Sequence, residues 1–174
     1  MKVLKKIFFL LFFTSVTFVL NAQNKINING NLIGPLKKSD LLSLKSKGWF
    51  NHGHDYNPNQ KIVQKIGKNL KGVHIKAFVG TWCHDSKRVI PRLYQILEMT
   101  EFDVDKNFEI IGITRGKKTP DNLQEGYNIK KTPTLIFFKN GKEIGRFVEH
   151  ARKTIEEDIL KIIKQKGYKH AYEK

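Results

Sequence analysis

The sequence predicts an α/β fold in which helices cover both faces of a mixed central β-sheet. Residues 73–79 and 108–114 are short, apolar and rich in β-branched side chains, which is typical of buried strands. Apolar residues recur at helical spacing between them, over residues 83–97, so the two strands are expected to be parallel with a right-handed crossover. Asn140–Gly141, the strongest short signal of a β-hairpin, adds antiparallel strands after them.

The chain ahead of these strands carries signals for a short edge strand and two helices. Residues 26–33 alternate between apolar and polar side chains, and Gly34–Pro35 is expected to end that strand. Ser39 suits the N-cap of a short helix through Lys47, and a second helix through Ile62 is expected to end near residue 72. These signals predict a largely helical segment.

Residues 23–72 are therefore interpreted as an N-terminal helical extension that packs on a main domain of residues 73–174. Trp49 and Phe50 lie in this extension, just before a polar loop. Two uses are open for them. They pack the extension onto the sheet, which is the favoured interpretation, or they present a hydrophobic patch to a client protein.

The last third of the chain is predicted from its turn and capping signals. Residues 119–122 favour a turn or the start of a short helix that runs to about Gly126. Thr154 and Glu157 have the spacing of a capping box and lead into an amphipathic helix over residues 155–163. The sequence contains no internal repeat and no low-complexity tract.

Residues 1–22 have the order of a secretory signal peptide. Three lysines precede an apolar run over residues 7–20, and Ala22 is a small residue at the expected cleavage point. The run of 14 residues is shorter than the ~20 that a membrane-spanning helix needs, which favours cleavage over a permanent anchor. The sequence thus predicts a periplasmic or secreted protein of 152 residues, with no stable membrane insertion after signal removal.

The chain is strongly basic, with a formal net charge of +16. Removal of residues 1–22, which hold three lysines and no acid, leaves +13. Such a charge attracts anionic surfaces or acidic peptides. Nucleic-acid binding is not expected, because the lysines are scattered and no aromatic stacking platform accompanies them.

Cys83 is the only cysteine of the chain. Disulfides persist in the compartments that exported proteins reach, yet this chain cannot form an internal bridge. The thiol is therefore free, paired with another molecule, or buried and inert. Its polar neighbours, and the aromatic Trp82 before it, argue for an exposed, reactive thiol and against a buried, inert one.

Two motifs carry a resemblance to a known family. Residues 80–87 read GTWCHDSK, and Pro91 follows eight residues after Cys83. Residues 127–134 read YNIKKTPT and lead into LIFFKNGK. In this order they resemble the thioredoxin family, whose W-C-x-x-C-K segment precedes a helix-kinking proline and whose Y-x-I-x-x-x-P-T run precedes an F-K-N-G hairpin. The resemblance covers about residues 73–167 and implies a thioredoxin-like fold.

The resemblance also implies a composite site. It predicts that the Thr132–Pro133 bond is cis and lies beside Cys83, with Trp82 shaping the surface next to the thiol. A cis proline leaves the preceding backbone open to pair with an extended substrate chain, which is a form of strand addition. Trp82, Thr132 and Pro133 are therefore the predicted substrate-binding residues.

The predicted catalytic residues are Cys83, Ser86 and His84. A cysteine in the first turn of a helix faces unpaired N–H groups and the positive end of the helix dipole, which both stabilise the thiolate. Ser86 can donate a hydrogen bond to that thiolate. A protonated His84 favours the thiolate and an ionised Asp85 opposes it, unless both are merely solvated residues of the first turn.

Two departures from the thioredoxin pattern limit the predicted chemistry. Ser86 replaces the second cysteine of the motif, and Ala77 stands where thioredoxins often keep a buried acid. This chain therefore has no second thiol to release a reduced client. Mixed-disulfide formation, isomerase-type exchange and thiol oxidation remain open, and whether the protein is an enzyme is left undecided.

The expected partners are client proteins or small thiols that react with Cys83, together with a dedicated outside reductant. The alternative is a monomeric, non-catalytic peptide-binding or chaperone-like module that uses the cis-proline groove. No cofactor is expected. His52, His54 and Asp55 have chemistry suited to a metal, but no second cluster of matching spacing accompanies them, so no metal site is predicted.

Overall fold

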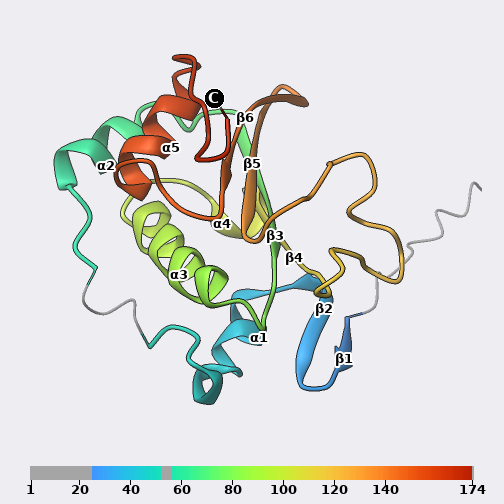
Figure 1. The fold of residues 1–174 in the computed structure, drawn as a ribbon. Coiled ribbons are helices and arrows are strands. Elements are labelled where there is room, and N and C mark those ends of the chain that lie inside the picture. Colours follow the sequence, from blue (N-terminus) through green and yellow to red (C-terminus); the bar gives the residue numbers. More distant parts are fainter. Residues whose placement is uncertain (1–24, 52–55, 174) are drawn as a thin grey trace, which may run out of the picture.

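The computed structural model describes residues 25–51 and 56–173, which form a six-stranded mixed sheet with helices packed against it (Figure 1). The strands lie in the order β1-β2-β4-β3-β5-β6. They are β1 (Ile26–Ile28), β2 (Asn31–Leu36), β3 (Val73–Val79), β4 (Phe108–Gly112), β5 (Thr134–Lys139) and β6 (Lys142–Val148). The helices are α1 (Lys38–Leu42), the 3-10 helix η1 (Lys45–Lys47), α2 (Gln60–Gly67), α3 (His84–Glu98), α4 (Val104–Asn107) and α5 (Ile155–Ile163).

The centre of the sheet has the predicted arrangement. β3 runs parallel to β4, with Ala77 opposite Ile110, and antiparallel to β5. Between β3 and β4 the chain forms α3, the amphipathic helix that the apolar spacing predicts. The predicted α/β class and mixed sheet are thus confirmed.

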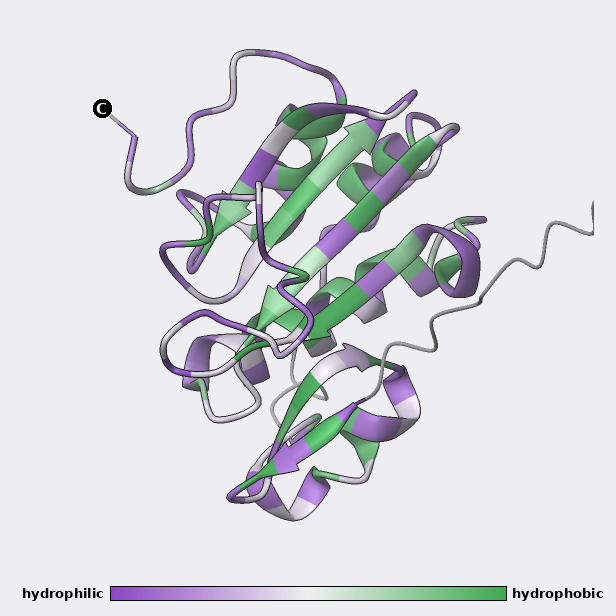
Figure 2. Ribbon diagram, turned by 90° about the vertical axis from the view of Figure 1, so that its right-hand side faces the viewer, coloured by the Kyte–Doolittle hydropathy of each residue, from purple (hydrophilic) through white to green (hydrophobic). Residues whose placement is uncertain are grey.

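The two faces of the sheet are covered differently. The larger apolar cluster joins one face to α2, α3 and α5, which all lie on the same side of the sheet in Figure 1. On the other face, the apolar side chains of Phe78, Ile111 and Ile136 pack against the irregular segment 123–129. Figure 2 shows the hydrophobic residues gathered mainly in the strands, with hydrophilic residues along the connecting loops.

The expectation of helices on both faces therefore differs from the structure in one detail. The described part of the segment between β4 and β5 contains turns in place of the predicted short helix up to Gly126. Gln124 accepts hydrogen bonds from the backbone and hydroxyl of Thr119, and Asn122 has a φ of 51°. These local side-chain bonds and left-handed residues favour turns over a helix.

The N-terminal extension contributes two strands to the sheet, where the sequence predicts one short edge strand that ends at Gly34–Pro35. β1 and β2 form a hairpin, and β2 pairs antiparallel with β4 through Gly34–Pro35, the dipeptide expected to end the strand. The two-residue loop of this hairpin is Asn29–Gly30, with φ values of 50° and 73°. A Cβ at Gly112 would lie 2.3 Å from the carbonyl oxygen of Leu32. Only glycine at this position therefore allows β2 to pair with β4.

The first helix of the extension begins at another residue than predicted. The N-cap of α1 is Lys37 rather than Ser39, because the Asp40 carboxylate accepts a hydrogen bond from the Lys37 backbone. α2 begins after Asn59, whose side chain accepts from the backbone of Lys61. Each start is set by a side chain that satisfies an unpaired backbone N–H group.

The C-terminal elements follow their signals. Asn140 and Gly141 have φ values of 52° and 74° and connect β5 to β6. Thr154 is the N-cap of α5 and accepts a hydrogen bond from the backbone of Glu157 at 3.2 Å. The predicted hairpin and last helix are both confirmed.

The predicted signal peptide, residues 1–22, lies outside the described residues. Among the helices that the structure does describe, none combines the length and apolar character needed to cross a membrane.

Candidate functional site

Cys83 is the N-cap residue of α3, with φ −86° and ψ 128°. The turn that leads from β3 to the helix is closed by a hydrogen bond of 2.8 Å from the Cys83 backbone to the Gly80 carbonyl. The Cys83 carbonyl in turn accepts from the backbone of Lys87 at 3.2 Å, inside the helix. This arrangement places the sulfur at the positive end of the α3 dipole.

The sulfur of Cys83 lies against the start of β5. It donates a hydrogen bond of 3.3 Å to the carbonyl oxygen of Thr132, 49 residues away in the sequence. The Thr132–Pro133 peptide bond is cis, and both residues are buried. Cys83 is only 9% exposed, which corrects the expectation of an exposed thiol. The resemblance predicts that Thr132 lies beside Cys83, but the polar residues around Cys83 do not indicate that the thiol is buried against it.

Ser86 is fully buried in the first turn of α3. Its hydroxyl accepts a hydrogen bond of 3.2 Å from the backbone of Gly80. The hydroxyl therefore binds the backbone of the turn before α3. The sequence suggests a bond to the sulfur of Cys83 instead. Ser86 holds the turn, and a role in tuning the thiolate stays a prediction.

Trp82 lies over the turn and is fixed on two sides. Its indole nitrogen donates a hydrogen bond of 3.1 Å to the carbonyl of Ile113, directly after β4. A Cβ at Gly80 would approach the indole ring to 2.6 Å, so a side chain at that position would displace the ring. On the outer side, the guanidinium of Arg115 lies 4.6 Å from the ring centroid.

The two residues after Cys83 differ in their surroundings. His84 is exposed, whereas Asp85 forms an ion pair of 2.6 Å with Arg88. Because a neighbouring cation balances its charge, Asp85 opposes a thiolate less than an isolated carboxylate would. The amine of Lys87 binds the Lys47 carbonyl at 2.6 Å, so this cation ties α3 to the extension.

The extension supports the active-site turn from behind, which the sequence alone does not indicate. Trp49 is fully buried, and its indole donates a hydrogen bond of 3.1 Å to the carbonyl of Thr81. The hydroxyl of Thr81 accepts from the backbone of Leu32, in β2, at 3.0 Å. The favoured interpretation of Trp49, packing of the extension onto the sheet, is confirmed. Thr81 stands inside the first motif but escapes prediction, because a threonine at that position carries no distinctive chemical signal.

The segment after strand β6 that runs from residue 149 to residue 173, here called the C-terminal segment, contacts Pro133 and its neighbours. The carbonyl of Pro133 accepts a hydrogen bond of 2.8 Å from the backbone of Glu149. The Glu149 carboxylate forms an ion pair of 3.7 Å with Lys131 and accepts a hydrogen bond from the hydroxyl of Tyr172. The amine of Lys131 lies 4.9 Å from the centroid of the Tyr172 ring.

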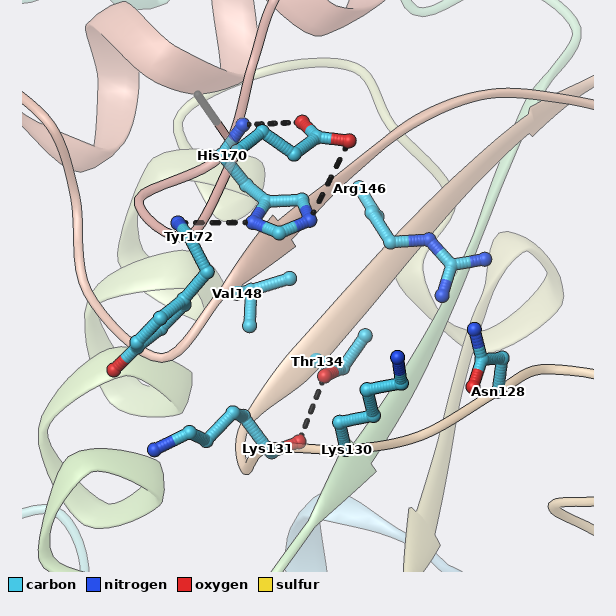
Figure 3. A pocket seen from close by; sticks show the side chains of 9 residues that line it. Asn128, Lys130, Lys131, Thr134, Arg146, Val148, His170 and Tyr172 are labelled. Atoms are coloured by element: carbon cyan, nitrogen blue, oxygen red, sulfur yellow. Dashed lines mark hydrogen bonds and ion pairs between the residues drawn. The ribbon is translucent and has the colours of Figure 1, made fainter.

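This segment closes a cavity of about 380 Å³ on the β5–β6 side of the sheet (Figure 3). Its ionisable side chains are largely paired: Arg146 lies against Glu143, Lys131 against Glu149, and His170 against Glu173. Thr134, in the centre of Figure 3, donates its hydroxyl to the Lys131 carbonyl at 2.8 Å. The lining thus serves mainly to hold the C-terminal segment.

The position of the absent acid is filled by a hydrophobic residue. Ala77 is fully buried in the larger apolar cluster, together with Val79 and Leu135. The candidate metal ligands His52, His54 and Asp55 lie outside the described residues. Within residues 25–51 and 56–173, no three histidine, cysteine or acidic side chains come close enough together to hold a metal ion.

The comparisons with known proteins agree with the fold and the motifs. The family model described as Thioredoxin matches residues 57–165. A thioredoxin-like protein of Acanthamoeba polyphaga mimivirus is 30% identical over 95 residues, which cover 55% of this chain and 66% of that protein. Thioredoxin H9 of Arabidopsis thaliana is 28% identical over 86 residues, which cover 49% of this chain and 56% of that protein. The chain thus spans less than two thirds of the length of these relatives.

Among solved structures, the germline-specific thioredoxin Deadhead of Drosophila melanogaster aligns with a TM-score of 0.38 and 16% identity. The alignment covers 59% of this chain and 88% of Deadhead.

Proposed function

The chain belongs to the thioredoxin family, and from that membership we propose that it is an exported thiol protein that acts through a single nucleophile, Cys83. Family membership indicates a thiol redox function in general terms. The observation that carries the finer proposal is the place of the sulfur, at the N-cap of α3 and 3.3 Å from the Thr132 carbonyl. An extended client disulfide that pairs with the backbone beside Pro133 would meet the sulfur there.

The proposed first step is attack of the Cys83 thiolate on one sulfur of a client disulfide. A new disulfide forms between Cys83 and the client, the client's own S–S bond breaks, and its second sulfur leaves as a thiolate. The Thr132 carbonyl can accept a hydrogen bond only while Cys83 is protonated, so this bond is lost on activation. The helix N-terminus then stabilises the anion.

Disulfide rearrangement is the reaction that suits a single cysteine. A second thiolate of the same client attacks the client sulfur of the mixed disulfide, forms a different client disulfide and releases Cys83 as thiolate. No electrons are gained or lost overall, so the cycle needs no second thiol in this chain. Net reduction of a client would need a thiol from another molecule to release the mixed disulfide, because the hydroxyl of Ser86 cannot replace the thiol of a second cysteine.

Export is part of the proposal and rests on residues 1–22. The basic start, the apolar run and the small residue at position 22 support a cleaved signal peptide. The periplasm or the extracellular space keeps protein disulfides intact, which supplies clients for rearrangement.

A second candidate is a peptide-binding module in which Cys83 is incidental. The burial of the thiol, at 9% exposure, and its hydrogen bond to Thr132 favour this candidate. Here the surface beside Trp82 and Pro133 binds extended chains without covalent chemistry. Both candidates use the same surface, so the thiol alone distinguishes them.

The test compares the protein with its Cys83→Ser variant, using a client with scrambled disulfides in a glutathione redox buffer. We expect the wild type to speed recovery of native client activity and the variant to leave it at the buffer rate. Non-reducing electrophoresis should show a client adduct only with the wild type. Equal acceleration by both proteins would exclude the nucleophile and leave the peptide-binding module.

A further inference from the structure

We propose that Arg115 binds an acidic side chain of the client, so that the site favours disulfides within acidic extended segments. This inference rests on the proposed function and adds the chemical class of the substrate. It comes from the loop after β4, residues 114–118, which belongs to neither of the two sequence motifs.

Arg115 lies over Trp82, the residue that directly precedes Cys83. The guanidinium lies 4.6 Å from the centroid of the indole. The residue is exposed, and it forms no ion pair within the part of the chain that the structure describes. A stacked guanidinium keeps its planar edge of N–H donors available to a carboxylate, which it can bind in a bidentate manner.

A cavity of about 210 Å³ adjoins this stacked pair. It is lined by Trp82, Thr114 and Arg115 together with residues of the β1–β2 hairpin, which are Ile28, Asn29, Asn31 and Ile33. Among these lining residues Arg115 alone is charged, and none is acidic. The hollow beside Trp82 therefore combines an apolar wall with a cation that has no carboxylate of its own.

The loop that carries Arg115 is held in one shape by its own hydrogen bonds. The backbone of Thr114 donates to the Lys118 carbonyl at 3.0 Å, and the Thr114 hydroxyl accepts from the Lys118 backbone at 3.1 Å. Lys117 adds a further cation whose amine binds the Arg115 carbonyl at 3.0 Å. A fixed loop with three basic residues presents positive charge at a defined place, at little entropic cost on binding.

Two acids near the motifs, one inside the first and one after the second, do not cancel this charge. Asp85 is paired with Arg88 at 2.6 Å, and Glu149 is paired with Lys131 at 3.7 Å. The charges of the loop are thus left for a partner. Acidic peptides complement them, in agreement with the formal net charge of +16.

The dimensions set where the acidic side chain stands in the client. Successive residues of an extended chain advance by roughly 3.3 Å each. We expect the residues one or two positions from a client cysteine bound to Cys83 to reach the guanidinium across the indole, on which it lies at 4.6 Å. We expect glutamate or aspartate at those positions to be preferred.

The experiment uses short peptides in which one cysteine carries a 2-thiopyridyl disulfide. Attack by Cys83 joins the peptide sulfur to the protein and releases pyridine-2-thione, whose absorbance gives the rate. Three peptides differ only at the residues on both sides of cysteine, which are glutamate, glutamine or lysine. Each rate is divided by the rate at which the same peptide reacts with N-acetylcysteine methyl ester, which removes the peptide's intrinsic reactivity.

We expect the wild type to react about two to five times faster with the glutamate than with the glutamine peptide, the range of an exposed ion pair. The preference should vanish in Arg115→Gln and shift to the lysine peptide in Arg115→Glu. The matched control is Lys142→Gln, which removes one exposed cation at the opposite end of the β5–β6 hairpin and should keep the preference. Added salt should weaken it, because the Debye length falls to about 3 Å at 1 M.

Two results would overturn the inference and a third would overturn its premise. If Arg115→Gln keeps the wild-type preference, another group binds the acid. If the wild type reacts equally with all normalised peptides, the site does not select charge. If the folded wild type reacts with no peptide, including the glutamine peptide, the nucleophilic function of Cys83 itself is excluded.

Discussion

At the scale of single residues, the candidate site holds one thiol, Cys83, and a serine where the thioredoxin motif has its second cysteine. Ser86 is one helical turn after Cys83, fully buried, and its hydroxyl holds the backbone of Gly80. Ala77 lies in the apolar cluster, where an acid could serve a second thiol. Packing and a structural hydrogen bond thus stand in place of a resolving pair, which is consistent with the proposed cycle, in which a thiolate of the client releases Cys83 from the mixed disulfide.

Replacement of Ser86 by cysteine tests this interpretation. We expect Ser86→Cys to form a disulfide between Cys83 and the introduced thiol on oxidation, since the two positions lie one helical turn apart, and to gain insulin-reducing turnover with dithiothreitol. Loss of the hydrogen bond from Gly80 should cost about 1 kcal/mol of unfolding free energy. Thiol titration and urea unfolding measure both effects. A variant that never forms the disulfide would show that more than the second thiol has been lost.

The sequence predicts the residues that surround the thiol well and the residues that support them poorly. Trp82, Cys83, Thr132 and Pro133 stand in recognisable patterns, and the structure brings the last three together. Thr81 and Arg115 are not predicted. Their importance comes from contacts with Trp49 and Trp82, which depend on the folded chain and leave no local pattern.

At the scale of elements, two hairpins share one turn signal, and only the second is predicted from the sequence. Asn140–Gly141 predicts the β5–β6 hairpin, and Asn29–Gly30 forms the β1–β2 hairpin with closely similar positive φ values. The first signal is missed because the alternation over residues 26–33 runs across Asn29–Gly30 and predicts one continuous strand, where the structure has β1 and β2. Pairing with β4, which Gly112 permits, stabilises this hairpin at the sheet edge.

The start of α5 is joined to the extension by a buried carboxylate. Glu156 is 4% exposed and accepts hydrogen bonds from the Tyr56 hydroxyl and, at 3.1 Å, from the backbone of Asn59. Burial of the carboxyl opposes its ionisation, but the hydrogen bonds outweigh burial and hold the pKa of Glu156 below its ordinary value of 4.5. The ionised form therefore favours the folded state.

The sign of the pH dependence follows from that lowered pKa. The stabilisation is complete above pH 4.5, the ordinary value for the carboxyl, and is lost as the pH falls through the lower value of the folded state. We expect Glu156→Gln to lower the unfolding free energy by about 1.5–3 kcal/mol at neutral pH. The difference from wild type should shrink in acid. Urea unfolding across this range is the measurement, and a difference that does not change with pH would contradict it.

At the scale of the whole molecule, the extension and the active-site turn form one structure. Trp49 belongs to the same apolar cluster as the inner face of α3, and its indole binds the carbonyl of Thr81, two residues before Cys83. Lys87 adds a bond from α3 to the Lys47 carbonyl. Unfolding of the extension should therefore also release the turn that positions the thiol.

Truncation of this tryptophan tests that coupling. Trp49→Ala should lower the unfolding free energy by about 3–5 kcal/mol, the usual cost of removing a large buried aromatic side chain. It should also slow the reaction of Cys83 with the neutral peptide, because Thr81 loses its partner. Leu42→Ala is the matched control: Leu42 also lies in the extension but is 45% exposed, so its removal should change stability by less than about 0.5 kcal/mol. If Trp49→Ala destabilises the fold while the residual folded protein reacts at the wild-type rate, the extension supports the fold alone. A matched loss of stability and reactivity would show that it also positions the thiol.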